Sequence, residues 1–144
     1  MALNILNPGL STSIQDLGRP GYFHLGIPIG GAMDRFAMRV ANMLVGNAED
    51  AAGLEAVFMG PEITFTEDTL IAITGAELPV MLDGVEQNTW TAIAVKKGQT
   101  LALGFCNQGR GFILRLVAAL IPPRRWAVGL RIRLGLLAVL KAEM

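Results

Sequence analysis

The sequence is poor in the residues that build disulfides and metal centres. Cys106 is the only cysteine and His24 the only histidine in 144 residues. One cysteine forms no internal disulfide and no thiolate cluster, so we expect no bound metal and a reducing, cytoplasmic compartment. Although 52% of the residues are hydrophobic, no uninterrupted apolar run reaches the roughly 18 residues of a membrane-spanning helix, and we expect no membrane association. The opening residues also lack the basic and apolar regions of a secretory signal.

The common catalytic motifs are absent as well. The sequence contains no phosphate-binding loop ending in Lys-Ser or Lys-Thr, no G-x-S-x-G, no H-E-x-x-H and no paired cysteines at zinc spacing. A single histidine and a single cysteine cannot by themselves specify a Cys-His or Ser-His-Asp site. Scarce polar groups gather early instead, in residues 15–34, which read QDLGRPGYFHLGIPIGGAMD. This segment therefore holds the candidate site.

The early segment carries polar side chains separated by glycines, namely Gln15, Asp16, Arg19 and His24 with Gly18, Gly21 and Gly26. Glycine lets the backbone approach a ligand closely, and arginine binds a carboxylate through two parallel hydrogen bonds. Asp16 and Arg19 could instead pair with each other and hold a tight turn. His24 suits either a general base, because imidazole titrates near neutral pH, or a hydrogen-bonded structural role. Gly30 and Gly31 either leave a helix N-terminus open to an anion or form a simple loop-to-helix turn.

One helix follows this segment. Residues 33–47, MDRFAMRVANMLVGN, show the three- and four-residue apolar spacing of an amphipathic helix. The apolar face predicted from this spacing comprises Met33, Phe36, Ala37, Val40, Ala41, Leu44 and Val45. Asp34 is placed as the N-cap, and Gly46 stands where a left-handed residue would end the helix. We therefore predict a helix over about residues 34–45.

From Leu54 onward the apolar period changes to two. The runs LEAVF, EITFTED, TLIAITG, PVMLDG, TWTAIAV and QTLALGF are separated by turn sequences such as Asp83-Gly84. Short strands at roughly ten-residue spacing predict an antiparallel barrel or sandwich. Glu55 interrupts the first run and is either a paired buried carboxylate or an outward-facing one, and strand alternation favours the outward position.

The charge distribution changes abruptly near Gly111. Residues 1–110 carry six Lys and Arg against eleven Asp and Glu, a net charge of −5, whereas residues 111–144 carry six against one, a net charge of +5. The later segment is also rich in Leu, Ala and Arg. Over the whole chain the charges cancel, and we expect no nucleic-acid partner. Two compositions therefore meet within one chain.

The segment GLSTSIQDLGRPGYFHLGIPIGGAMDRFAMRVANMLVGN, followed by LEAVFMGPEITF and IAITGAEL, closely resembles the allophanate hydrolase subunit 2 family. That family is also known as the C-subunit of 5-oxoprolinase and as the biotin-dependent carboxyltransferase domain of urea carboxylase. The resemblance runs from about Asn4 to Gly111. It implies a mainly β fold, a cyclophilin-like antiparallel β-barrel that occurs twice in a full-length member, so residues 1–111 would form a partial first domain.

The resemblance also implies an enzyme subunit acting on a small amide or urea substrate. One implied activity is an ATP-dependent hydrolase, 5-oxoprolinase, which opens the lactam of 5-oxoproline to glutamate. Its implied partners are an allophanate hydrolase subunit 1-type protein and a LamB/YcsF-type subunit, with ATP bound on this subunit or another. The other implied activity moves a carboxyl group from carboxybiotin to urea. A regulatory or binding module that pairs with a subunit 1-type protein, and a non-functional fragment, are the alternatives.

Carried over residue by residue, the family motif falls on Gln15, Asp16, Gly18, Arg19, Gly31, Ala32 and Asp34. We predict Asp16, Arg19 and His24 as catalytic. The predicted substrate-binding residues are Gln15, Gly18, Gly31, Ala32 and Asp34. These positions either take part in the chemistry or only shape the mouth of the barrel.

Beyond Gly111 the chain departs from the family. The family pattern continues with segments like YLAVSGGIDTP and GSRSTYTLGALGGFQGR, whereas this chain reads FILRLVAALIPPRRWAVGLRIRLGLLAVLKAEM. When the third base of each codon is read with the first two bases of the next, residues 127–132 permit Gly-Ser-Arg-Ser-Thr-Tyr and residues 138–143 permit Gly-Gly-Phe-Gln-Gly-Arg. We therefore predict that residues 112–144 are a frameshifted tail outside the family, which would also explain the charge reversal.

Overall fold

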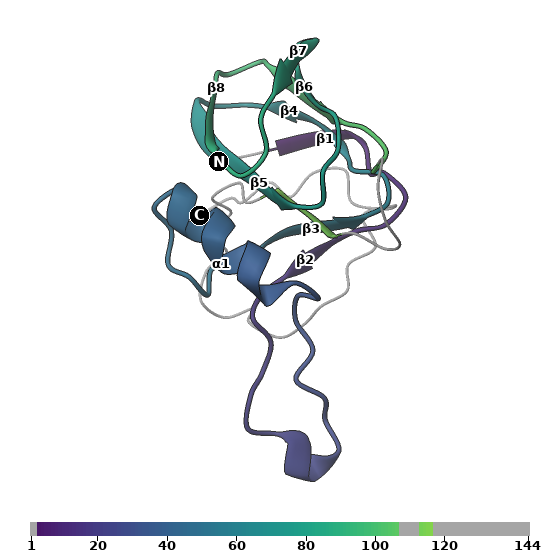
Figure 1. Cartoon of the computed structure of the whole chain (residues 1–144), viewed down its shortest axis with the longest axis vertical. Coiled ribbons are helices and arrows are strands. Elements are labelled where there is room, and N and C mark those ends of the chain that lie inside the picture. The colour runs from purple at the N-terminus through teal and green to yellow at the C-terminus, as the bar shows by residue number, and fades with distance from the viewer. Residues whose placement is uncertain (1–2, 107–112, 117–144) are drawn as a thin grey trace.

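The computed structural model describes residues 3–106 and 113–116. In chain order its elements are β1 (Leu3–Asn7), β2 (Thr12–Gln15), the short 3-10 helix η1 (Phe23–Leu25), α1 (Arg35–Leu44), β3 (Gly53–Val57), β4 (Glu62–Phe65), β5 (Thr69–Gly75), β6 (Val80–Leu82), β7 (Val85–Gln87), β8 (Ala92–Val95), β9 (Thr100–Leu103) and β10 (Ile113–Leu116). Figure 1 shows the strands gathered in one body, with α1 beside it and a long loop that carries η1 away from it.

The strands form two five-stranded antiparallel sheets. One sheet has the order β1-β4-β9-β6-β7 and the other has the order β2-β3-β10-β5-β8. Neither sheet closes on itself over the described part of the chain. The mainly β fold with one prominent helix is therefore confirmed, with the strands arranged as two open sheets and not as a closed barrel.

One hydrophobic core joins the two sheets. Strand alternation supplies it, because every second residue of a strand faces the same side. In β4 the side chains of Ile63 and Phe65 are buried while Glu62 and Thr64 are only partly buried. The other buried members are Leu54, Ala56, Ile71, Ile73, Leu78, Val80, Leu82, Ile93, Val95, Leu101 and Leu103. The core therefore lies between the sheets, and the candidate site lies outside it.

The two ends of α1 lie where the sequence predicts them. Asp34 is the N-cap, and its Oδ1 accepts a hydrogen bond from the backbone N–H of Ala37 at 2.8 Å. At the other end Gly46 has a φ of +75°, the left-handed conformation that glycine adopts without a steric penalty. The cap and the terminating glycine are both confirmed.

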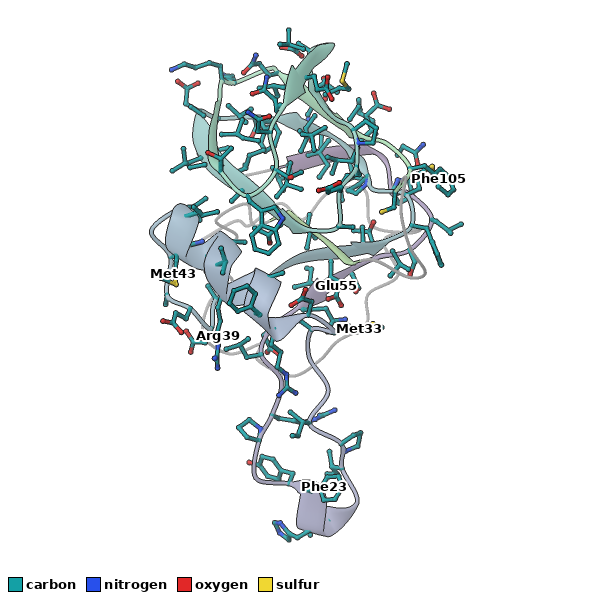
Figure 2. The ribbon with its side chains drawn as sticks, viewed as in Figure 1. Phe23, Met33, Arg39, Met43, Glu55 and Phe105 are labelled. Atoms are coloured by element: carbon teal, nitrogen blue, oxygen red, sulfur yellow. The ribbon has the colours of Figure 1, made fainter. Side chains whose placement is uncertain are left out.

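The buried face of α1 differs from the predicted one. Ala37, Met38, Ala41 and Asn42 are buried, whereas Met33 just before the helix is 78% exposed and Phe36 is 71% exposed. Alanines on the inner face let the helix approach β5 closely, and Thr74 donates a hydrogen bond to the carbonyl oxygen of Ala37 at 2.8 Å. Met38 is also buried on this face, whereas Phe36 and Met43 lie outward, as Figure 2 shows for Met43.

The predicted runs contain six of the described strands, β3 to β6, β8 and β9. The predicted turn Asp83-Gly84 joins β6 to β7, and both of its residues have positive φ angles, of 49° and 79°. Strands β1, β2 and β7 lie outside the predicted runs. Gln15, expected in a loop, is the last residue of β2.

Strand β10 comes from the segment predicted as a frameshifted tail. It lies in the middle of its sheet and pairs with β3 on one side and β5 on the other. The rest of the 112–144 prediction falls on residues 112 and 117–144, which lie outside the described residues. Over the residues that the structure does describe, no helix is long and apolar enough to cross a membrane.

Candidate functional site

A cleft of about 310 Å³ lies where β2 leads into the glycine-rich segment. Its lining combines the end of β2, the residues that return from the long loop, and one residue of β3. The lining residues are Gln15, Asp16, Gly18, Arg19, Pro28, Ile29, Gly30, Gly31, Met33 and Glu55. The structure thus brings together five of the predicted site residues, Gln15, Asp16, Gly18, Arg19 and Gly31.

Two glycines allow the walls of the cleft to cross at close range. Gly18 and Gly31 have φ angles of +84° and +78°. A Cβ on Gly31 would lie 2.5 Å from the backbone nitrogen of Gly18, and one on Gly18 would lie 2.6 Å from the carbonyl oxygen of Gly30. Any side chain at either position would push the segments apart, so both glycines are required by the geometry of the crossing.

Asp16 holds this crossing by hydrogen bonds. Its Oδ1 accepts the backbone N–H of Gly18 at 2.7 Å, which is an Asx turn. Its backbone carbonyl accepts the N–H of Ala32 from the opposite wall at 2.8 Å. No ion pair joins Asp16 to Arg19, both of which are among the described residues. The alternative in which those two side chains pair is therefore wrong, because Asp16 holds the turn through the backbone.

Arg19 brings a positive charge to the cleft. Its backbone N–H donates to the carbonyl oxygen of Ile29 at 2.9 Å, which fixes the main chain. The residue as a whole is partly buried, and its guanidinium makes no hydrogen bond or ion pair with any residue that the structure describes. Next to it, the amide of Gln15 donates from Nε2 to Oγ of Ser13 at 3.0 Å. A guanidinium without an internal partner is suited to an anionic ligand.

Glu55 faces the cleft, and its predicted outward position is wrong. It is only 7% exposed, and its Oε1 accepts the backbone N–H of Met33 at 3.1 Å. Figure 2 shows Glu55 on its strand beside Met33 at the start of the helix. Alternation misleads here because the residues before α1 cover the second face of β3, so that residues 53 to 56 are all buried. The signal in the sequence is the carboxylate that interrupts an apolar run.

His24 lies outside the cleft. It belongs to η1, at the tip of residues 20–30, which we call the arm. Every residue of the arm is exposed, including Phe23 at 78%. The arm projects away from the sheets, with Phe23 at its far end (Figures 1 and 2). The structure therefore does not bring His24 together with Asp16 and Arg19.

The last two predicted residues lie beside the cleft without lining it. Ala32 is 4% exposed and contributes its backbone N–H to the bond with Asp16. Asp34 caps α1. Their substrate-binding roles stay predictions. The lining also includes residues to which the motif assigns no role, namely Pro28, Ile29, Gly30 and Met33. The sequence does not reveal them because the fold brings them to the cleft only where the chain returns from the arm.

The chain is similar to proteins of known family. Residues 25–119 match the family model described as carboxyltransferase domain, subdomain A and B. The urea amidolyase of Saccharomyces cerevisiae is 42% identical over 109 residues, which cover 75% of this chain and 6% of that protein. The 5-oxoprolinase C-subunit of Haemophilus influenzae is 36% identical over 121 residues, covering 78% of this chain and 39% of that protein. The solved urea carboxylase of Kluyveromyces lactis has a TM-score of 0.74 at 35% identity, covering 80% of this chain and 10% of that one.

The chain is much shorter than the relatives that it matches. It spans less than half the length of the curated relatives it matches, including 44% of the 5-oxoprolinase C-subunit of Escherichia coli. Relatives that are named as a 5-oxoprolinase C-subunit belong to an enzyme with other subunits. The resemblance carried by the glycine-rich motif is thereby confirmed at the level of the family.

Proposed function

Because the chain belongs to the family of carboxyltransferase domains, subdomain A and B, we propose that it is a shortened homologue of the C-subunit of an ATP-dependent 5-oxoprolinase. The proposed reaction of the complex opens the lactam of 5-oxoproline to glutamate. The observation that carries the proposal is the cleft, in which Gln15, Asp16 and Arg19 of the family motif lie together. Likeness to the 5-oxoprolinase C-subunit of Haemophilus influenzae supports this choice of reaction.

In this proposal Arg19 binds the carboxylate of the substrate through its guanidinium fork. Gln15 carries both a donor and an acceptor, as recognition of a lactam requires. Asp16 uses Oδ1 to accept the N–H of Gly18 in the turn. The proposal places its other carboxylate oxygen, Oδ2, against the reacting amide of the substrate. Gly18 and Gly31 keep the walls close enough to enclose a small molecule. Since His24 lies outside the cleft, the proposal gives the catalytic roles to Asp16 and Arg19.

The proposal places ATP on a partner subunit. Arg19 is the single cation in the lining of the described cleft, and it lies there with the carboxylates of Asp16 and Glu55. The negatively charged triphosphate of ATP would meet two carboxylates and only one guanidinium, which is a poor electrostatic match. The partners proposed are an allophanate hydrolase subunit 1-type protein and a LamB/YcsF-type subunit. The complex would work in the cytoplasm.

Carboxyl transfer is the second candidate function. The 42% identity to a urea amidolyase and the description of the matching family model both favour it. In that branch a biotin carried by another domain would supply the carboxyl group and urea would receive it. The cleft would then hold a neutral substrate, and Arg19 would face the carboxyl group in transit.

The first test is a complex made with the reading frame restored and the two partner subunits expressed together with it. Release of glutamate from 5-oxoproline with ATP supports the first function, and carboxylation of urea supports the second. Glutamate release is expected to fall at least about tenfold in kcat/KM for Arg19→Ala, because a charge-assisted bidentate contact is lost. The matched control is Arg39→Ala, which removes an exposed arginine of α1 whose Nε lies 3.9 Å from Oε2 of Glu49.

Unchanged turnover in Arg19→Ala would show that the cleft is not the active site. Activity in neither assay, with partner binding retained, would support a binding or regulatory module. A chain that neither reacts nor binds its partners would be a non-functional fragment. Each outcome therefore selects one of the alternatives.

We also propose that residues 1–111 are a partial first domain and that residues 112–144 come from a shifted reading frame. The family resemblance at the motif, the unlike residues after Gly111 and the reversal of charge support this proposal. Sequencing the DNA around codon 111 tests it. An intact frame through that codon, with the same arginine- and leucine-rich ending in relatives, would contradict it.

A further inference from the structure

We propose that Glu55 is a positioning residue that fixes the wall of the cleft that carries Arg19, through a chain of hydrogen bonds donated by backbone amides that ends at Arg19. Only the consequence for ligand binding depends on the proposed function. The relay itself is a property of the folded chain, with no ligand present. It begins on β3, crosses to the residues before α1, and returns to the residues after β2.

The first step joins the sheet to the wall that precedes the helix. Strand β3 is held on both sides, since Glu55 pairs in register with Ser13 of β2 and with Arg115 of β10. Glu55 is only 7% exposed, and its Oε1 accepts the N–H of Met33 at 3.1 Å. The position of Met33 is thereby set by a residue 22 positions away in the sequence.

The second step passes from this wall to the opposite one. Ala32 is bonded directly to Met33, and its N–H donates to the carbonyl oxygen of Asp16 at 2.8 Å. Asp16 in turn holds the N–H of Gly18 at 2.7 Å. The N–H of Arg19 then donates back to Ile29 at 2.9 Å. The peptide links from Ala32 to Met33 and from Gly18 to Arg19 connect these bonds, so Arg19 is tied to β3 through the backbone.

The close approach of the backbone at Gly18 and Gly31 leaves the hydrogen-bonded segments little room to move relative to each other. The position of a Cβ on Gly31 lies 2.5 Å from the nitrogen of Gly18 and 2.7 Å from the carbonyl oxygen of Asp16. Two backbones at this separation cannot shift far toward each other, and their hydrogen bonds oppose separation. A displacement at Met33 is therefore transmitted to Gly18 and Arg19, and is not absorbed by a flexible loop.

Hydrogen exchange of the full chain without ligand tests the relay. Four amides report on it, those of Gly18, Arg19, Ala32 and Met33. In Glu55→Asp, which keeps the charge but shortens the side chain by one methylene, we expect protection to fall about tenfold at all four amides. In Glu55→Gln, which keeps the reach and an acceptor oxygen, we expect protection within about threefold of the wild-type value. Glu62→Asp is the matched control, a carboxylate of the same length on β4 of the other sheet.

A loss confined to Met33 in Glu55→Asp would overturn the proposal, because the displacement would then stop at the first bond. Equal loss in the core strands β4 and β9 would also overturn it, since the effect would be global unfolding. The same loss in Glu55→Gln as in Glu55→Asp would also count against the relay, because an acceptor oxygen of unchanged reach would then fail to hold the amide of Met33.

A titration with 5-oxoproline, followed through the side-chain Nε–H resonance of Arg19, adds the consequence for binding. Affinity is expected to fall about tenfold in Glu55→Asp and to be retained in Glu55→Gln. The variants could show the expected exchange pattern while the wild-type chain fails to bind 5-oxoproline. That result would count against the proposed function and leave the relay supported. The two proposals therefore fail separately.

Discussion

At the scale of single residues, Gly30 and Gly31 are neighbours with similar backbone angles and different surroundings. Their φ angles are +64° and +78°. A Cβ on Gly30 would meet no heavy atom within 4 Å, whereas one on Gly31 would lie 2.5 Å from the nitrogen of Gly18. Alanine at either position is strained by the left-handed backbone, but only Gly31→Ala also forces the two walls of the cleft apart.

Gly30→Ala is expected to lower the free energy of unfolding by about 1 kcal/mol, the cost of left-handed backbone for alanine. Gly31→Ala should lose about 1–3 kcal/mol more, because overpacking is added to that cost. Urea unfolding of the two variants, followed by circular dichroism, measures the difference. Equal losses in the two variants would show that the crossing opens without cost.

At the scale of elements, Asp34 shows how a motif residue can serve the fold. Its Oδ1 accepts the N–H of Ala37 at the start of α1. Asp34→Ala is expected to lower the free energy of unfolding by about 1 kcal/mol, since an N-terminal amide of the helix loses its acceptor. Asp34→Asn, which can still cap the helix, is the control and should change it by only about a few tenths of a kcal/mol. Unchanged stability in Asp34→Ala would argue against the cap as the reason for an aspartate here.

The ends of α1 could be predicted from the sequence, whereas its inner face could not. Capping depends on residues close in the sequence, such as Asp34 and Gly46, so the preferences of neighbouring residues are enough to predict the helix ends. The helix carries apolar residues on more than one side, and periodicity does not say which side meets the sheet. Close approach to β5 selects the small side chains of Ala37 and Ala41, and larger ones such as Phe36 lie outward.

The site was predictable where its residues are close in the sequence. Gln15, Asp16 and Arg19 belong to one motif, and the fold keeps them together. Glu55 joins them only because β3 pairs with β2, a contact between distant segments. Alternation assumes that one face of a strand meets solvent, and on β3 that face is covered by the residues before α1. Long-range pairing is the part that local patterns do not encode.

At the scale of the whole molecule, one sheet depends on both parts of the chain. Strand β10, from the segment predicted as a frameshifted tail, separates β3 from β5. It pairs with β3 over four residues and with β5 over three. Hydrogen bonds of a β-ladder join backbone groups, so a strand can form from residues that were not selected for that position, provided that they tolerate an extended backbone. A shifted reading frame and a central strand are therefore compatible.

Two truncations separate the strand from the rest of the tail. A chain that ends after residue 111 removes β10 and leaves β3 and β5 with one unpaired side each, so we expect it to lose the sharp cooperative transition in thermal unfolding. A chain that ends after residue 120 keeps β10 and is expected to melt like the full chain. Near-ultraviolet circular dichroism during heating makes the comparison. Identical melting of the two truncated chains would mean that β10 contributes nothing to cooperativity, and that β3 and β5 are held by β2, β8 and the core alone.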